Sequence, residues 1–320
     1  MVLAADQAAN LTRPGGAGNR RRRQRKDYGL LLAALPFLAF VIVFRYIPLG
    51  GWLLAFCDYR LGHGLAEIPF VGFGNFADLL SDYRYLSSIL LNTVCMNSLL
   101  LLNAPIAVGL SVLITELPRK KLRSITQTAT TLPHFVSMVI VYSLFFSMFS
   151  SSGAVNRLLL NLGIVGRPIN VLGNPRLTWF FQFGVYLWKH CGWNAIIFLS
   201  AITSIDPQLY DAAAIDGAGR FRRILHVTLP GILSTFLVVL LLNISRLLSN
   251  GGLWEQAFVF MNPMVQSKLE ILDYYIYRMG IVAADFSYAT AAGVVNSAIS
   301  IALLFSVNGM AKRLRGQAII

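Results

Sequence analysis

Long apolar runs, separated by short polar segments, make up most of the chain and are too long for the helices of a water-soluble domain. About 20 consecutive apolar residues suffice for a helix to cross the hydrocarbon core of a bilayer. The pattern therefore predicts six membrane-spanning helices: Tyr28–Phe56, Leu86–Thr115, Ile125–Phe149, Leu177–Ile202, Pro230–Leu248 and Asp285–Met310. The first run is overlong and is interrupted by Pro48, Gly50 and Gly51. We expect its tail, from Arg45 to Phe56, to leave the membrane or bend along its outer face.

The composition agrees with a membrane protein. Apolar residues make up 56% of the 320 residues and charged residues only 13%, whereas soluble domains carry about a quarter charged residues. The first 26 residues are polar and lack the apolar core of a secretory signal. The predicted fold class is an all-α polytopic membrane protein, with a basic tail at residues 1–27 and a membrane domain at residues 28–320.

The basic residues of the loops predict the orientation, because Lys and Arg concentrate in cytoplasmic loops. With the N-terminus in the cytoplasm, the inner segments hold 17 Lys and Arg residues and the outer segments hold 7. We therefore expect both termini in the cytoplasm of a bacterial inner-membrane, multi-pass protein. The net charge of +13 and the run Arg20–Arg23 would also suit nucleic acid. Orientation explains that run, so we expect no nucleic-acid partner.

The segment between the fourth and fifth predicted spans, residues 203–229, has the residues of a helix–turn–helix elbow. Asp206-Pro207 suits a helix start, because the carboxylate can cap free N–H groups and proline fits the first turn. Gly217 and its neighbours supply a sharp turn. We expect a second short helix over Arg220–Val227, followed by a new span that opens at Pro230.

The surface of this elbow suits contact with another protein. The alanines at 212–214 leave a thin face that another backbone can approach, and Phe221, Ile224 and Leu225 offer apolar anchors. An ordinary re-entry loop packed against the inner membrane surface explains the composition equally well. The residues alone therefore leave both interpretations open.

The spacing in the elbow resembles the coupling-loop signature of permease subunits of type I ABC importers. That signature is an acidic residue and two alanines, a glycine after three more residues, an aliphatic residue after nine more, and Leu-Pro after one more. Asp211-Ala212-Ala213, Gly217, Val227 and Leu229-Pro230 fall in register, with Asp211 and Val227 in place of the usual glutamate and isoleucine. The resemblance implies that ATPase coupling involves Asp211, Ala212, Ala213, Asp216, Gly217, Arg220, Arg222, Arg223, Leu229 and Pro230.

Weaker motifs look like the sugar and polysaccharide branch of these permeases, which is maltose-permease-like and includes alginate-type oligosaccharide importers. They are Arg45–Leu49, Val71–Phe76, Asn92-Thr93 and Trp188–Trp193. The resemblance implies a second permease subunit, two ATPase subunits and an extracytoplasmic solute-binding protein as partners. No glycine precedes a lysine, so the chain has no phosphate-binding P-loop. We therefore expect no enzyme activity, catalytic residue, metal or cofactor in this chain, with ATP and magnesium held by the ATPase.

Polar side chains within the spans are candidates for a substrate pathway, because such groups are costly in a membrane. Asn243, Arg246 and Asn250 share one helical face, and counted from Pro230 that stripe falls where the maltose-importer permease lines its sugar site. Amides suit sugar hydroxyls because they both donate and accept hydrogen bonds. The pathway candidates are Trp188, Lys189, His190, Trp193, Asn194, Asn243, Arg246 and Asn250.

Each candidate has a structural alternative. The asparagines can hydrogen-bond neighbouring helices, Arg246 can snorkel to the outer surface, and His134 suits packing and pathway equally. Lys189 lies deep in its span with no acidic residue in any span core, so we expect its partner to be the second permease, water or the substrate. Lys189, His190 and Arg246 motivate the hypothesis of an acidic saccharide such as a uronate oligomer.

The leading interpretation is a permease that imports an oligo- or polysaccharide by alternating access. An ABC permease for a non-saccharide solute is the first alternative. A secondary transporter is less favoured, since it typically shows inverted repeats and intramembrane carboxylates, and the sequence shows neither.

Overall fold

The computed structural model describes residues 18–60, 62, 68–245, 247 and 252–315. It divides into two compact units, Met1–Leu53 and Leu54–Ile320. The described residues of both units are predominantly helical, and an isolated antiparallel bridge joins Cys57 to Phe70. The predicted all-α class is confirmed.

The first unit is a single helical run. It consists of α1 (Gly18–Val41), a π-helical turn (η1, Ile42–Tyr46) and the start of a 3-10 helix (η2, Ile47–Phe56). Leu31–Phe56 has the length and apolarity of a membrane span, and the most apolar part of it is exposed on all sides. A helix that is apolar all round is suited to lipid. Regular α-helical geometry ends at Val41, before Pro48, Gly50 and Gly51, the residues that predicted an interruption.

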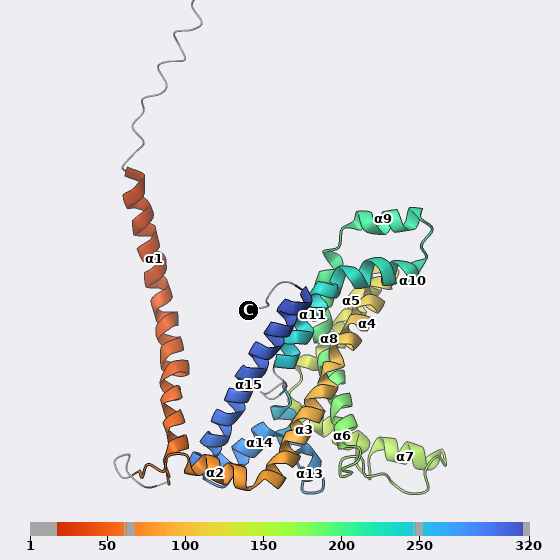
Figure 1. Cartoon of the computed structure of the whole chain (residues 1–320). Coiled ribbons are helices and arrows are strands. Elements are labelled where there is room, and N and C mark those ends of the chain that lie inside the picture. Colours follow the sequence, from red (N-terminus) through yellow and green to blue (C-terminus); the bar gives the residue numbers. More distant parts are fainter. Residues whose placement is uncertain (1–17, 61, 63–67, 246, 248–251, 316–320) are drawn as a thin grey trace, which may run out of the picture. The chain divides into compact units, whose positions relative to one another are not determined.

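The second unit is a bundle of tilted helices with distinct ends. The helices α3, α4, α8, α11 and α15 run along the unit; α9 and α10 lie at one end, and α2, α7 and α13 lie at the other (Figure 1). The bounds are α2 Gly74–Ser81, α3 Tyr83–Leu101, α4 Asn103–Glu116, α5 Lys120–Thr131, η4 Leu132–Phe135, α6 Met138–Phe149, α7 Ala154–Asn161, α8 Thr178–Thr203, α9 Pro207–Ile215, α10 Arg220–Arg223, η5 Ile224–Thr228, α11 Leu229–Ser245, α12 Trp254–Phe260, α13 Gln266–Leu269, α14 Leu272–Tyr277, η6 Arg278–Val282 and α15 Phe286–Arg315.

Helix α8 is the centre of the second unit. Its buried residues recur every three or four positions, so one face is in the core along the whole helix. Near the α9 end, Ala195 and Phe198 pack with residues of α4 and α11, and the Ser111 hydroxyl of α4 donates to the Ala195 carbonyl at 3.0 Å. Toward the other end, Val185 packs with α3, α6 and α12. The α8 side chains between these two clusters are held by packing on both sides.

The predicted third span, Ile125–Phe149, was wrong as a continuous helix. The structure breaks it into α5, the 3-10 turn η4 and α6. Pro133 lies in η4, and proline both lacks an N–H and crowds the carbonyl four residues earlier. The run with the length and apolarity of a span begins at Met138 and extends to Asn161.

Five helical runs among the described residues are long and apolar enough to cross a membrane: Leu31–Phe56, Tyr83–Glu116, Met138–Asn161, Arg220–Ser245 and Phe286–Ser306. Helix α8, the predicted fourth span, is not one of them, although it is 26 residues long. The polar side chains of Gln182, Lys189, His190 and Asn194 lower its hydropathy. Gln182 and Lys189 are buried within the unit, and the hydropathy of α8 is low because it counts such packed polar groups as if they faced lipid.

Candidate functional site

The first arm of the elbow has the caps that its sequence predicts. Asp206 accepts a hydrogen bond from the Gln208 amide at 2.9 Å and so caps α9. At the other end Gly217 has a φ of 73°, a left-handed conformation that glycine adopts without strain. The Ala218 amide then donates to the Ala213 carbonyl at 2.9 Å, which closes a Schellman cap. The helix start and the glycine turn are both confirmed.

The second arm differs from the prediction. Arg220–Ser245 is one helical run, in which α10 passes through the π-helical turn η5 into α11. The predicted bounds agree to one residue, since η5 ends at Thr228 and α11 begins at Leu229; the prediction of two separate helices was wrong, because the run is continuous. A π turn accommodates an interruption of the regular hydrogen-bond ladder. Pro230 causes such an interruption, because it has no N–H to donate and its ring crowds the preceding turn.

The elbow presents large apolar side chains at its surface. Ile215 is 87% exposed and Phe221 is 86% exposed. Large apolar side chains this exposed make the elbow a candidate contact site. The Tyr210 and Thr228 hydroxyls are 3.0 Å apart and tie α9 to η5, so the two arms are held together while their apolar tips remain accessible.

Most of the residues that the resemblance assigns to ATPase coupling are at this surface. Arg220 lies 3.7 Å from the carboxylate of Glu116 in an exposed pair, an arrangement that contributes little stability. Ala213 and Arg223 are half-buried, and the exposed members are Asp211, Ala212, Asp216, Gly217, Arg220, Arg222, Leu229 and Pro230.

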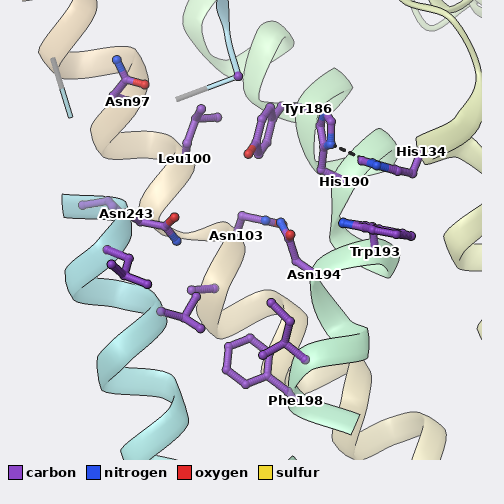
Figure 2. A pocket seen from close by; sticks show the side chains of 16 residues that line it. Asn97, Leu100, Asn103, His134, Tyr186, His190, Trp193, Asn194, Phe198 and Asn243 are labelled. Atoms are coloured by element: carbon purple, nitrogen blue, oxygen red, sulfur yellow. Dashed lines mark hydrogen bonds between the residues drawn. The ribbon is translucent and has the colours of Figure 1, made fainter. Parts of the chain in front are cut away.

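A cavity of about 450 Å³ lies between α3, α4, α8 and α11 (Figure 2). Apolar side chains such as Leu100 and Phe198 form part of its wall. The rest is polar or aromatic and consists of Asn97, Asn103, Asn194 and Asn243 with His134, Tyr186, His190 and Trp193. The cavity therefore combines amide groups with flat rings.

The rings form a continuous wall. His134 stacks on Trp193 with parallel planes, the centroids 4.5 Å apart and the planes inclined by 6°. Its Nδ1 atom is 3.2 Å from Nδ1 of His190 (Figure 2), and the Tyr186 ring lies 4.5 Å from the His190 ring. One tautomer of one histidine must donate to the other across this contact.

Asn103 lines the cavity and carries a buried acceptor. The residue is 4% exposed, and its Oδ1 atom has no hydrogen-bond partner among the residues that the structure describes. A buried acceptor without a partner costs free energy, so Asn103 is a polar group of the wall that packing within the described part of the chain does not explain.

The structure brings together half of the predicted pathway residues. His190, Trp193, Asn194 and Asn243 line the cavity. Asn97 and Asn103 were missed, although their position in an apolar run was the same signal that identified Asn243. Arg246 and Asn250 lie outside the described residues.

Trp188 and Lys189 do not line this cavity. Trp188 lies against Phe145 of α6, with ring centroids 5.6 Å apart. Lys189 is buried, and its Nζ atom donates to the backbone carbonyls of His134, at 3.1 Å, and Val136. Carbonyls of the chain itself thus accept hydrogen bonds from Lys189, and the counter-charge expected from a second subunit, water or the substrate stays a prediction.

A helical membrane protein with an accessible elbow at one end and a polar cavity between its long helices is organised as a transport permease. The chain belongs to the family of binding-protein-dependent transport system inner membrane components, which matches residues 84–316. It is therefore a multi-pass inner-membrane subunit of an ABC importer with the type I permease fold, separate from the ATPase and without a cofactor of its own.

The relatives agree on this assignment. Protein LplB of Bacillus subtilis strain 168 is 38% identical over 90% of this chain and 90% of its own length. The polygalacturonan/rhamnogalacturonan transport system permease protein YteP of the same strain is 36% identical over 89% and 88%. A solved bacterial ABC transporter involved in the import of the acidic polysaccharide alginate has a chain with a TM-score of 0.83 and 30% identity, covering 93% of this chain and 99% of that one.

Proposed function

We propose that this permease carries an oligo- or polysaccharide into the cytoplasm. The core cavity is the observation that carries the proposal, because it combines four asparagine side chains with a wall of rings. Amides donate to and accept from sugar hydroxyls, and aromatic faces pack against the apolar faces of sugar rings. The relatives named for polygalacturonan/rhamnogalacturonan transport and alginate import support the same substrate class.

The proposed topology has six spans, with residues 1–27 as a cytoplasmic tail and residues 28–320 as the permease domain. Helix α8 is the sixth span in addition to the five apolar runs; its 26 residues extend about 39 Å at 1.5 Å per residue. The excess of basic residues in alternate loops supports cytoplasmic termini. The elbow is then cytoplasmic, and α2, α7 and α13 are on the outer side.

The proposed assembly contains a second permease, two ATPase subunits that hold ATP and magnesium, and an extracytoplasmic solute-binding protein. A solved relative of this chain was crystallised with an alginate pentasaccharide-bound periplasmic protein, which supports the last of these partners. The elbow docks on the ATPase through Ile215 and Phe221. ATP-driven closure of the ATPase moves the elbow and shifts the equilibrium between outward-facing and inward-facing cavities.

Replacing Phe221 by aspartate is expected to weaken the association of ATPase and permease about tenfold to thirtyfold, because it removes an apolar anchor of the proposed interface. The measurement is the amount of ATPase that co-purifies with the permease across a dilution series. Ile164→Asp is the control: Ile164 is 65% exposed, and its amide donates to the Leu159 carbonyl of α7, a helix at the opposite end of the unit from α9 and α10 (Figure 1). The proposal is contradicted if Phe221→Asp co-purifies as much ATPase as the wild type does. It is also contradicted if transport proceeds without any ATPase.

Replacing Asn243 by leucine is expected to lower saccharide uptake about fivefold, since one amide that can bind a hydroxyl is lost. Uptake is measured in proteoliposomes with saturating, saccharide-loaded binding protein, and ATPase activity is measured in parallel. Ser234→Ala, at an exposed position of the same helix, is expected to behave as wild type. Equal uptake by Asn243→Leu and Ser234→Ala speaks against a pathway through this cavity.

A further inference from the structure

The break between α5 and α6 leaves backbone carbonyls without helical partners. Helix α5 ends at Thr131, η4 ends at Phe135, and α6 begins at Met138. The Val136 amide still donates to the Pro133 carbonyl at 3.2 Å. The carbonyls of His134 and Val136 point instead to a donor from another helix. Buried carbonyls at a helix break need such a donor.

Lys189 of α8 supplies that donor. Its side chain is 5% exposed, and its ammonium donates to the carbonyls of both His134 and Val136. A buried ammonium is costly unless it is hydrogen-bonded, and carbonyls at a helix break are strong acceptors. The lysine and the break therefore stabilise each other.

The same short stretch of α8 also holds the side chain of His134. His190, the next residue after Lys189, lies 3.2 Å from the imidazole of His134. Trp193, one turn further along, covers the face of that imidazole at 4.5 Å. Lys189 holds the backbone, and His190 and Trp193 hold the ring. Three residues of one helix thus fix the position of one cavity-lining group.

We propose that Lys189 is a positioning residue for transport, which holds the α5–α6 break in place and thereby keeps the His134 ring against Trp193 on the cavity wall. The inference rests on the proposed function, because the wall is assigned there to the saccharide. Lys189 acts through His134 and does not itself contact the saccharide. It is consequently not the cation that selects an acidic substrate.

The test uses the complete transporter with its binding protein in proteoliposomes, comparing Lys189→Met, Lys189→Arg and the control Lys268→Met. Lys268 lies over the Trp179 ring, 5.0 Å from its centroid, and belongs to neither the break nor the cavity. Two probes are used, alginate pentasaccharide as an acidic oligosaccharide and maltopentaose as a neutral one. Each measurement gives the saccharide transported per ATP hydrolysed, together with amide hydrogen exchange over residues 132–138.

Lys189→Met is expected to lower the amount of saccharide transported per ATP hydrolysed about tenfold, because a charge-assisted hydrogen bond is lost. The same loss is expected for every probe that the wild type carries. Exchange over residues 132–138 is expected to become at least tenfold faster. Lys189→Arg, which keeps donors for both carbonyls, is expected to restore most of the coupling. A purely structural loss lowers uptake and ATP hydrolysis in proportion and leaves their ratio unchanged.

Three results overturn the inference. One is a loss confined to the acidic probe, which identifies Lys189 as a substrate ligand. Another is an unchanged ratio of transport to hydrolysis, and the third is unchanged exchange over residues 132–138. If the wild-type complex carries neither probe, the proposed function fails for both sugars, and the exchange measurement then decides the role of Lys189 by itself.

Discussion

Replacing Gly192 by alanine is expected to reduce the folded permease in membranes at least tenfold. A Cβ atom at this position would lie 2.0 Å from the carbonyl oxygen of Thr130, and the adjoining backbone of Thr131 is also too close. The obstacle is the backbone of α5, which has no flexible end that can move aside. Helices α5 and α8 must separate, at a cost of about 3 kcal/mol.

The measurement for Gly192→Ala is the amount and thermal stability of the detergent-extracted permease. Gly184→Ala is the matched control, because Gly184 belongs to the same helix and a Cβ atom there meets no atom within 4 Å. Both variants exchange glycine for alanine in α8, so helix propensity cancels. Equal stability of the two variants would show that the α5–α8 contact is looser than the structure indicates.

Replacing Glu270 by alanine is expected to destabilise the second unit by about 3 kcal/mol, because a buried charged acceptor of two hydrogen bonds is lost while Arg278, whose side chain is 30% exposed, keeps part of its hydration. Glu270 is 2% exposed, and Arg278 donates to its Oε1 atom at 2.7 Å. Tyr85 of α3 donates to its other oxygen. Burial lowers the pKa of Arg278, but the hydrogen bond and charge of Glu270 outweigh burial and raise that pKa above its ordinary value. Removing the carboxylate takes that stabilisation away, but the guanidinium stays charged because arginine does not lose its proton in proteins.

Thermal unfolding of the purified permease measures this loss. Glu270→Gln keeps a hydrogen-bonding side chain of the same size and is expected to lose less stability than Glu270→Ala. Asp58→Asn is the control, because the Asp58 and Arg60 side chains are 42% and 75% exposed, and such pairs contribute about 0–1 kcal/mol. If Glu270→Ala were as stable as Asp58→Asn, the contacts of Glu270 with Arg278 and Tyr85 would contribute no more to stability than an exposed ion pair, which contradicts the prediction.

The local features of the elbow could be predicted from the sequence because each depends on residues close together in the chain. The cap at Asp206 and the left-handed Gly217 follow from chemistry within one or two turns. Pro133 can be seen in the sequence as a proline within an apolar run. The helix break there also needs a hydrogen-bond donor for its free carbonyls, and that donor comes from a distant part of the chain. Lys189, the donor, is 53 and 55 residues away from the carbonyls that it binds.

The same limit applies to Glu270 and to the cavity. Glu270 and its partner Tyr85 are 185 residues apart, and no local pattern in the sequence joins them. Polarity within apolar runs drew attention to His190, Asn194 and Asn243, which line the cavity. The same criterion could not distinguish these residues from Lys189, because a polar residue that faces a cavity and one that faces a helix break give the same pattern in the sequence.

The run Arg220–Ser245 connects the elbow to the cavity without leaving helical geometry. Phe221 is on the elbow side of the π turn η5, and Asn243, which lines the cavity, is on the other side. Proline and π turns are the places where helices bend, and α10 and α11 run in different directions (Figure 1). A displacement of the elbow at Phe221 therefore reaches Asn243 through η5, and the stiffness of that one turn sets how much of the displacement arrives.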